Sequence, residues 1–222
     1  MFLTGGAGTG KSHTLKKCIQ VLKSVYPIDQ IAITGSTGVA ALQIGGTTLH
    51  SWSGITNSQM STSAIYINIK LNPRKMELWR RVKVLIIDEI SMIDCEFFDK
   101  LNEVSKRLRG DLRPFGGIQL LLGGDFFQLP PVTPSSQRCR FAFEASTWKE
   151  CKLITKSLSY SFRQNDDKTF VDFLNEARVG IISDKFSITL FNIQRNCSTK
   201  HSSITPLEMY GNELFLKMKT DI

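Results

Sequence analysis

The sequence predicts a doubly wound α/β fold, in which a parallel sheet carries helices on both faces. Four short apolar runs have the length and composition of buried strands, namely MFLT (1–4), IAIT (31–34), VLII (84–87) and IQLLL (118–122). Each run is followed by a polar or glycine-rich turn, and helical periodicity appears between the runs. This alternation indicates a sheet whose ligands bind at the carboxyl ends of its strands.

The first strand leads into the segment GGAGTGKS at 5–12, which satisfies the P-loop pattern G-x-x-x-x-G-K-[ST]. A helix with apolar residues at Leu15, Ile19 and Leu22 follows it. Glycines let successive N–H groups face phosphates, Lys11 adds a point charge, and the Ser12 hydroxyl is a ligand for Mg²⁺. We therefore expect ATP phosphates to contact Gly5, Gly6, Ala7, Gly8, Thr9, Gly10, Lys11, Ser12 and His13. The alternative is a glycine-rich turn that Lys-Ser happens to follow.

The second strand leads into GSTGVAAL, which can open a helix whose N–H groups hold the backbone phosphates of a nucleic acid. The segment GGTTLHSW adds rings that can stack on bases without reading their sequence. The candidate nucleic-acid contacts are Ser36, Thr37, Gly38, Thr47, His50 and Trp52. Core packing of Trp52 and an internal hydrogen bond of His50 remain the alternatives. The next stretch, 53–72, is polar and rich in Ser and Thr, which suggests an insertion or exposed loop.

The third strand ends in Asp88-Glu89. At the sheet edge the first carboxylate can hold a metal and the second can orient an attacking water, although acids also begin helices as N-caps. The doubled acid favours hydrolysis over phosphate transfer by a small-molecule kinase. A helix with Phe97, Leu101, Val104 and Leu108 on one face follows, with Asp94 and Gly110 as its expected caps.

The fourth strand runs into GGDFFQLPPV, where Gln128 can both donate to a γ-phosphate oxygen and accept from the lytic water. Pro130 and Pro131 restrict the backbone beside it. The alternative is a surface turn in which Gln128 is solvated. Beyond this point a helix is expected near 166–178, and the irregular segment that follows reads as a linker.

Composition limits the class of protein. The 222 residues are 41% hydrophobic and 22% charged, as in ordinary globular proteins, and the net charge of +8 fits a polyanionic partner without requiring one. The five cysteines form no C-x-x-C pair, which favours a reducing intracellular compartment over a zinc site or disulfide frame. No apolar run approaches the roughly 20 residues of a membrane span, so we expect no membrane partner.

Five segments together resemble the N-terminal motor domain of the PIF-type DNA helicases, relatives of RecD. They are FLTGGAGTGKS, GSTGVAALQIGGTTLHSWSGI, VLIIDEISMID, PFGGIQLLLGGDFFQLPPV and LSYSFRQNDDKTFVDFLNEAR. The resemblance implies a RecA-like P-loop NTPase that uses ATP and Mg²⁺ to move 5′ to 3′ on single-stranded DNA and at DNA forks. It also implies roles in replication, repair, recombination or telomere maintenance, residence in the nucleus or mitochondrion, and a monomer.

The resemblance assigns roles to particular residues. Lys11 serves the phosphates, Ser12 and Asp88 the metal, and Glu89 the water. Gln128 becomes a γ-phosphate sensor, and Arg163 an arginine that reaches the γ-phosphate. From the residues alone, a lone Arg163 before a helix is more often a surface charge, although a cation of this kind fits the charge of the transition state.

The resemblance also divides the chain. Residues 1–182 correspond to the first RecA-like motor domain, with a small wedge subdomain as an insertion at 53–75, 183–203 is a linker, and 204–222 resembles the start of a second RecA-like domain. We expect this chain alone to bind Mg·ATP weakly and to unwind little. Two other functions stay open: a truncated DNA-binding or regulatory module without turnover, and a P-loop kinase for a small acceptor.

Overall fold

The structure is a computed structural model. It describes residues 1–55, 57, 59–133, 138–160, 162, 168–181, 183–189 and 191. The chain divides into two compact units, Met1–Arg163 and Gln164–Ile222, and each is described by itself.

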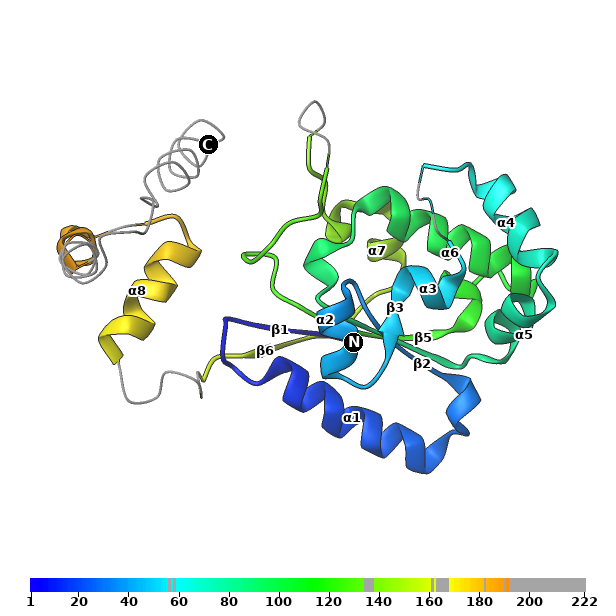
Figure 1. Ribbon diagram of the computed structural model, residues 1–222, viewed down its shortest axis with the longest axis horizontal. Helices are drawn as coiled ribbons and strands as arrows, with labels where there is room; N and C mark the ends of the chain where they lie inside the picture. The colour runs from blue at the N-terminus through cyan, green and yellow to red at the C-terminus, as the bar shows by residue number, and fades with distance from the viewer. Residues whose placement is uncertain are drawn as a thin grey trace, which may run out of the picture. The chain divides into compact units, whose positions relative to one another are not determined.

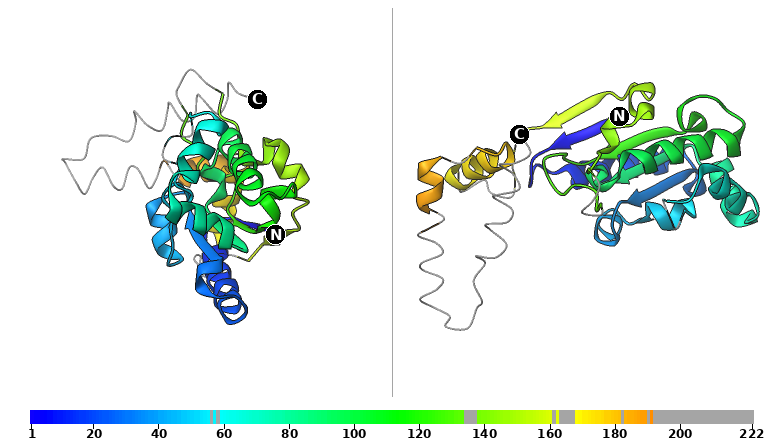
Figure 2. Two further views of the ribbon diagram at one scale, coloured as in Figure 1. Left: turned by 90° about the vertical axis from the view of Figure 1, so that its right-hand side faces the viewer. Right: turned by 90° about the horizontal axis from the view of Figure 1, so that it is seen from above.

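The first unit contains a six-stranded sheet in the order β3-β2-β4-β5-β1-β6, and every pair of neighbouring strands is parallel. The arrows of β1 and β6 point the same way in Figure 2. The strands are β1 (Phe2–Gly5), β2 (Ile31–Gly35), β3 (Thr47–Thr48), β4 (Val84–Asp88), β5 (Gln119–Gly123) and β6 (Thr155–Leu158). The four predicted strands are confirmed, and β3 and β6 are additional.

Helices cover both faces of this sheet, and Figure 1 shows α1 on one side and α6 on the other. The α-helices are α1 (Lys11–Val25), α2 (Gly38–Gln43), α3 (Leu49–Ser53), α4 (Thr62–Lys70), α5 (Pro73–Arg81), α6 (Cys95–Arg109), α7 (Ser146–Glu150) and α8 (Lys168–Arg178). Short 3₁₀ segments are η1 (Ile28–Gln30), η2 (Ile90–Met92), η3 (Pro114–Gly117) and η4 (Ala142–Glu144). The predicted α/β architecture is therefore confirmed.

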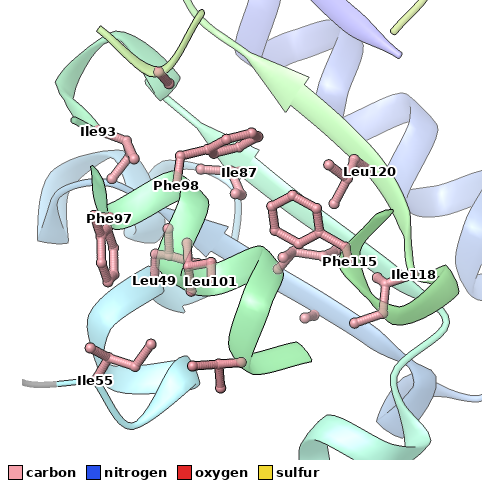
Figure 3. Packing of buried hydrophobic residues seen from close by; sticks show 14 of the residues in the cluster. Leu49, Ile55, Ile87, Ile93, Phe97, Phe98, Leu101, Phe115, Ile118 and Leu120 are labelled. Atoms are coloured by element: carbon pink, nitrogen blue, oxygen red, sulfur yellow. The ribbon is translucent and has the colours of Figure 1, made fainter. Parts of the chain in front are cut away.

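The buried side chains form two clusters, one on each face of the sheet. Successive strand residues point to opposite faces, so Leu85 and Ile87 of β4 join one cluster and Ile86 joins the other. The larger cluster packs β4 and β5 against α6, as Figure 3 shows for Phe98 and Leu101. A strand that is covered on both faces is apolar throughout, which explains the run VLII.

Helix α6 begins and ends at the two predicted caps. The Asp94 carboxylate accepts a hydrogen bond from Phe97 N at 2.8 Å. Gly110 has φ 64°, a left-handed conformation that costs glycine no strain. These caps fix where α6 starts and ends, and the short segment η2 connects its start to the acidic end of β4.

The stretch 53–72 differs from the expected loop because it contains α4. Ser61 caps this helix by accepting from Ala64 N at 3.3 Å, and Ile65 and Ile69 are each 2% exposed. Two apolar residues four apart are enough to bury one face of a short helix. Ile67 lies between them and is 52% exposed, so the three isoleucines alternate as strand residues do and hide the helical pattern. The assignment of 53–75 as a wedge subdomain remains a prediction.

The second unit contains α8, which confirms the helix expected near 166–178. Residues 184–189 are also helical, and Phe186 stacks on Phe173 with ring centroids 4.6 Å apart. Most of the predicted linker and all of 204–222 lie outside the described residues. The domain boundaries therefore remain predictions. Within the described part of the chain, no helix is both long and apolar enough to cross a bilayer.

Candidate functional site

The site lies where the parallel strands end. Because β1, β2, β4 and β5 run in the same direction, their carboxyl ends open at one edge of the sheet. The glycine-rich segment follows β1, Ser36 follows β2, Asp88 closes β4, and the segment with Gln128 follows β5. Chain segments that are far apart in the sequence are thereby brought to one edge.

The segment between β1 and α1 is shaped to face an anion. Gly10 precedes α1 with φ 86°, and no side chain caps the first N–H groups of the helix, which remain available to a ligand. The Lys11 ammonium is 7% exposed and donates to the carbonyl oxygens of Gly5 at 2.9 Å and Gly6 at 3.0 Å. Ala7 and His13 are exposed, and Thr9 bonds Gly6 O at 2.9 Å.

Close packing on β6 requires glycine at position 5. A Cβ atom there would lie 2.4 Å from the carbonyl oxygen of Leu158 and 2.7 Å from Oγ1 of Thr9, at φ +153°. The loop is therefore held against a neighbouring strand, and a larger residue would displace it.

Ser12 and Asp88 form an oxygen pair at the mouth of this loop. The Ser12 hydroxyl donates to Oδ2 of Asp88 at 2.9 Å, and Oδ1 accepts from Glu89 N at 3.0 Å. Asp88 is fully buried, and a Cβ on Gly123 would lie 2.9 Å from its Oδ1. Hydroxyl and carboxylate oxygens suit Mg²⁺, which usually takes only one or two protein ligands beside phosphate oxygens and waters. Among the described residues, no group of three or more His, Cys, Asp or Glu side chains is arranged to hold a metal ion.

Glu89 has an unusual backbone and an unusual carboxyl group. Its φ of 55° and ψ of 50° are left-handed, a conformation that is costly for a residue with a Cβ. Burial raises the pKa of the Glu89 carboxyl, repulsion from Asp88 and Asp125 raises it further, and Lys11 opposes the rise. A carboxyl group whose pKa is moved toward neutrality is suited to accept a proton from water.

Gln128 lies at the end of a tight turn that begins at Asp125. Gln128 N donates to the Asp125 carbonyl at 2.9 Å, which closes the turn. The Asp125 carboxylate accepts from Phe127 N at 3.2 Å and from Nε2 of Gln128 at 3.1 Å. The amide of Gln128 is therefore bonded inside the protein and is not simply solvated.

Sequence reasoning missed Asp125 and the ring of Phe126. Phe126 lies between β5 and a group of aromatic rings, with centroid distances of 4.8 Å to Phe143 and 5.5 Å to Phe2. One signal in the sequence could have identified Asp125, because Asp is favoured at the first position of such turns.

Phe162 also lies beside the phosphate loop. Its backbone N–H donates to Gly8 O at 2.9 Å, and its ring lies 3.8 Å from the position of a Cβ on Gly10. Phe162 is 69% exposed and therefore presents an aromatic surface next to the loop. The following residue, Arg163, lies outside the described residues.

The candidate DNA residues after β2 adjoin Asp88. Ser36 N donates to the carbonyl oxygen of Asp88 at 3.0 Å, and Thr37 caps α2 by accepting from Ala40 N at 3.2 Å. The hydroxyl oxygen of Ser36 is buried and has no hydrogen-bond partner among the described residues. Gly38 has open space around its Cα.

His50 and Trp52 are packed against the protein. The His50 ring stacks on Phe97 with centroids 4.5 Å apart, and burial lowers the pKa of His50, with Asp94 opposing the change. The Trp52 ring contacts that of Trp79 at 4.6 Å. Thr47 is exposed. The two rings are thus partly used for packing, and their contact with DNA stays a prediction.

Comparison with known proteins points to one family. A family model described as PIF1-like helicase matches residues 1–187. ATP-dependent DNA helicase PIF1 of Saccharomyces cerevisiae is 40% identical over 215 residues, which cover 96% of this chain and 25% of that protein. The sequence thus spans about a quarter of this curated relative.

Solved structures agree with this match. The crystal structure of Pif1 helicase from Candida albicans is 46% identical with a TM-score of 0.83, over 87% of this chain and 43% of that one. Pif1 helicase from Bacteroides, solved in complex with ADP-AlF3 and ssDNA, is 31% identical with a TM-score of 0.70, over 83% and 43%. The predicted RecA-like α/β fold is thereby confirmed.

Proposed function

Because this chain belongs to the PIF1-like helicase family, we propose that it is the first motor domain of an ATP-dependent 5′-to-3′ DNA helicase. The observation that supports this most strongly is the meeting of a phosphate loop, the Ser12–Asp88 pair and Glu89 at one sheet edge. This set of groups serves phosphate binding and water activation together. The proposed substrates are ATP, single-stranded DNA and DNA forks.

Lys11 and the first N–H groups of α1 bind the phosphates of ATP. Lys11 already donates to two carbonyl oxygens of the loop, so its ammonium is directed toward the loop interior. Ser12 and Asp88 would hold Mg²⁺, which neutralises charge on the phosphates when it is bound. The exposed ring of Phe162 offers a flat apolar surface for the base.

Glu89 takes the proton of the attacking water. Its raised pKa makes the carboxylate a better base than an ordinary Glu, and the charge of Lys11 opposes the rise in pKa. Gln128 and Arg163 are the proposed contacts to the γ-phosphate, from the turn after β5 and from the segment after β6. Gln128 connects nucleotide state to the DNA side.

Single-stranded DNA lies along the ends of β2 and β3 in this proposal. The backbone N–H groups at the start of α2, with Ser36, Thr37 and Gly38, hold phosphates, while Thr47, His50 and Trp52 line the track. Contacts of this kind do not depend on base sequence. The net charge of +8 supports a polyanionic partner.

The wider setting is proposed from the family alone. Members named as DNA helicases act on DNA, so we place this protein in replication, repair, recombination or telomere maintenance, in the nucleus or the mitochondrion. We propose that it acts as a monomer. The structure of Pif1 at forked dsDNA with two coordinating helicases makes its oligomeric state on a fork a useful measurement.

The test is ATP hydrolysis with and without oligo-dT, compared between the wild type, Glu89→Gln and Lys11→Ala. We expect oligo-dT to stimulate the wild type. Glu89→Gln should lower kcat by about 10²- to 10⁴-fold while ATP still binds, because only the base is lost. Glu77→Gln, an exposed acid on α5, is the matched control and should hydrolyse like the wild type.

Two outcomes would select the other functions. Equal hydrolysis by wild type and Glu89→Gln would favour a DNA-binding or regulatory module without turnover. Phosphate transferred to a small acceptor, with no response to oligo-dT, would favour a kinase, although nothing in the family match supports one.

A further inference from the structure

The turn after β5 contains a carboxylate that the proposed mechanism has not used. Asp125 is 1% exposed, and its two carboxylate oxygens accept from Phe127 N at 3.2 Å and from Nε2 of Gln128 at 3.1 Å. Buried carboxylates are costly unless such bonds satisfy them. The two acceptor bonds therefore fix the carboxylate and the amide in one arrangement.

This arrangement sets the direction of the Gln128 amide. The two ends of a glutamine amide differ, because Nε2 donates and Oε1 accepts, whereas a carboxylate only accepts. Asp125 can bond only the Nε2 end, so turning the amide over would place two acceptors in contact. The Oε1 atom and the second Nε2 hydrogen are then directed away from Asp125.

We propose that Asp125 is a positioning residue that determines which end of the Gln128 amide faces the reacting groups. Oε1 is presented as an acceptor for the attacking water, and the remaining N–H is presented to a γ-phosphate oxygen. The inference rests on the proposed role of Gln128 in ATP hydrolysis. A free glutamine would sample both orientations, and in one of the two an N–H donor would replace the acceptor that orients the attacking water.

The rest of the turn supports a fixed position. Gln128 N bonds the carbonyl of Asp125 at 2.9 Å, and the Phe126 ring packs edge-on against Trp148 at 5.7 Å and against Phe143 at 4.8 Å. The turn is thus anchored on one side by an aromatic cluster and on the other by hydrogen bonds. Gln128 is held by contacts within four residues of the chain.

A double-mutant cycle on the 222-residue chain tests whether Asp125 acts through Gln128. We expect Asp125→Ala to lower kcat of DNA-stimulated hydrolysis about tenfold with KM for ATP within about twofold, because the reacting geometry is lost while binding is kept. In a Gln128→Ala background the same change should cost less than about twofold. Additive losses would show that Asp125 acts independently, and would overturn the proposal.

Two further variants distinguish an effect on the direction of the Gln128 amide from an effect on the packing of the turn. Asp125→Asn keeps the shape and the acceptor for Phe127 N, but its Nδ2 hydrogens oppose those of Gln128, so kcat should fall as in Asp125→Ala while Tm is retained. Asp125→Asn combined with Gln128→Glu restores the bond with reversed polarity and the same total charge. We expect this pair to keep Tm at the wild-type value and not to recover kcat. Recovery of kcat would mean that the turn is only structural.

A spectroscopic measurement tests the hydrogen bond between Asp125 and Gln128 without measuring ATP hydrolysis. The Nε2 hydrogens of Gln128, assigned by their loss in Gln128→Ala, should exchange with solvent more slowly in the wild type than in Asp125→Asn. Asp29→Asn, in a surface ion pair with Arg81, is the control and should leave this exchange unchanged. Free exchange in the wild type would overturn the proposal. Absence of hydrolysis in every variant would count against the proposed function, and the exchange measurement would still decide the role of Asp125.

Discussion

Glu89 combines a strained backbone with the carboxyl group that the proposed reaction needs. It is one of three residues other than glycine with positive φ among the described residues. Such strain costs on the order of 1–2 kcal/mol and is often found at functional sites. The strain turns the chain sharply after Asp88, so that adjacent carboxyl groups take different positions.

Comparing glycine with alanine at position 89 measures this strain. Both substitutions remove the carboxylate, but only alanine keeps a Cβ in the left-handed conformation. We expect Glu89→Gly to be more stable than Glu89→Ala by about 1 kcal/mol in urea unfolding, the reverse of the usual preference. Both variants should lose hydrolysis. If Glu89→Ala were the more stable, the positive φ would not hold in solution.

Cys151 shows how burial controls a reactive group away from the site. Burial, with repulsion from Glu150, raises the pKa of its thiol from 9.0 to about 11. The thiolate is the nucleophile, so at pH 8 its fraction falls about a hundredfold and alkylation by iodoacetamide should be slow. The rate should rise when urea unfolds the chain and when the pH approaches 11, as followed by mass spectrometry of the Cys151 peptide. Fast labelling at pH 8 in the folded chain would contradict this.

Among the elements, α6 links the core to the acidic end of β4. Its N-cap Asp94 is separated from η2 only by Ile93, and its apolar face supplies Phe97, Phe98 and Leu101 to the larger cluster. A helix whose start is fixed by a cap also fixes the chain that enters it. The position of Glu89 therefore depends on where α6 begins.

Removing this cap should lower the stability of the folded chain. We expect Asp94→Ala to lower the free energy of unfolding by about 1 kcal/mol, because Phe97 N loses its acceptor. Asp94→Asn keeps an acceptor oxygen and should cost less. Chemical denaturation of the three proteins measures both values, and equal losses would show that charge and not capping is responsible.

The sequence predicts elements well where the burial pattern is regular. The four apolar strands and the two caps of α6 are confirmed because each has a local signal, either a buried run or a capping residue. Strand β3 has two residues, and β6 (TKSL) is exposed along most of its length, so neither shows an apolar pattern. The helix α4 is hidden because only Ile65 and Ile69 mark its buried face.

The residues of the candidate site also divide into those with a local sequence signal and those without one. Lys11, Ser12, Asp88 and Glu89 follow from motifs at strand ends, and the structure brings them together. Asp125 has no motif of its own, because its importance comes from a side-chain bond to Gln128 that only the folded turn displays. For His50 and Trp52 the sequence does not separate packing from binding, since one ring face can pack while the other stays accessible.

At the scale of the whole molecule, the described residues provide one parallel sheet with one nucleotide edge. Translocation in motors of this kind requires two domains that close and open around ATP. The first unit contains the groups that we propose for phosphate binding and water activation, and the proposed DNA track adjoins them. We therefore expect ATP hydrolysis and DNA unwinding to be separable in experiments on this chain.

We expect the 222-residue chain to unwind a 5′-tailed duplex at no measurable rate in a fluorescence strand-displacement assay. Mg·ATP should bind it weakly, with a Kd measurable by a fluorescent nucleotide. Lys11→Ala is the control that removes any contribution of ATP. Unwinding by the wild-type chain that Lys11→Ala abolishes would show that one sheet suffices.

The backbone hydrogen bond from Ser36 N to the carbonyl oxygen of Asp88 connects two parts of the candidate site. It joins the strand that would hold the metal to the loop that would hold DNA, within a sheet whose central strands are covered on both faces. Because the central strands are packed on both faces, we expect the β2–β4 pair to keep its geometry when ATP or DNA binds. Any movement that couples the two ligands is then expected in the loops that follow the strands, and the Asp125–Gln128 turn is one of these loops.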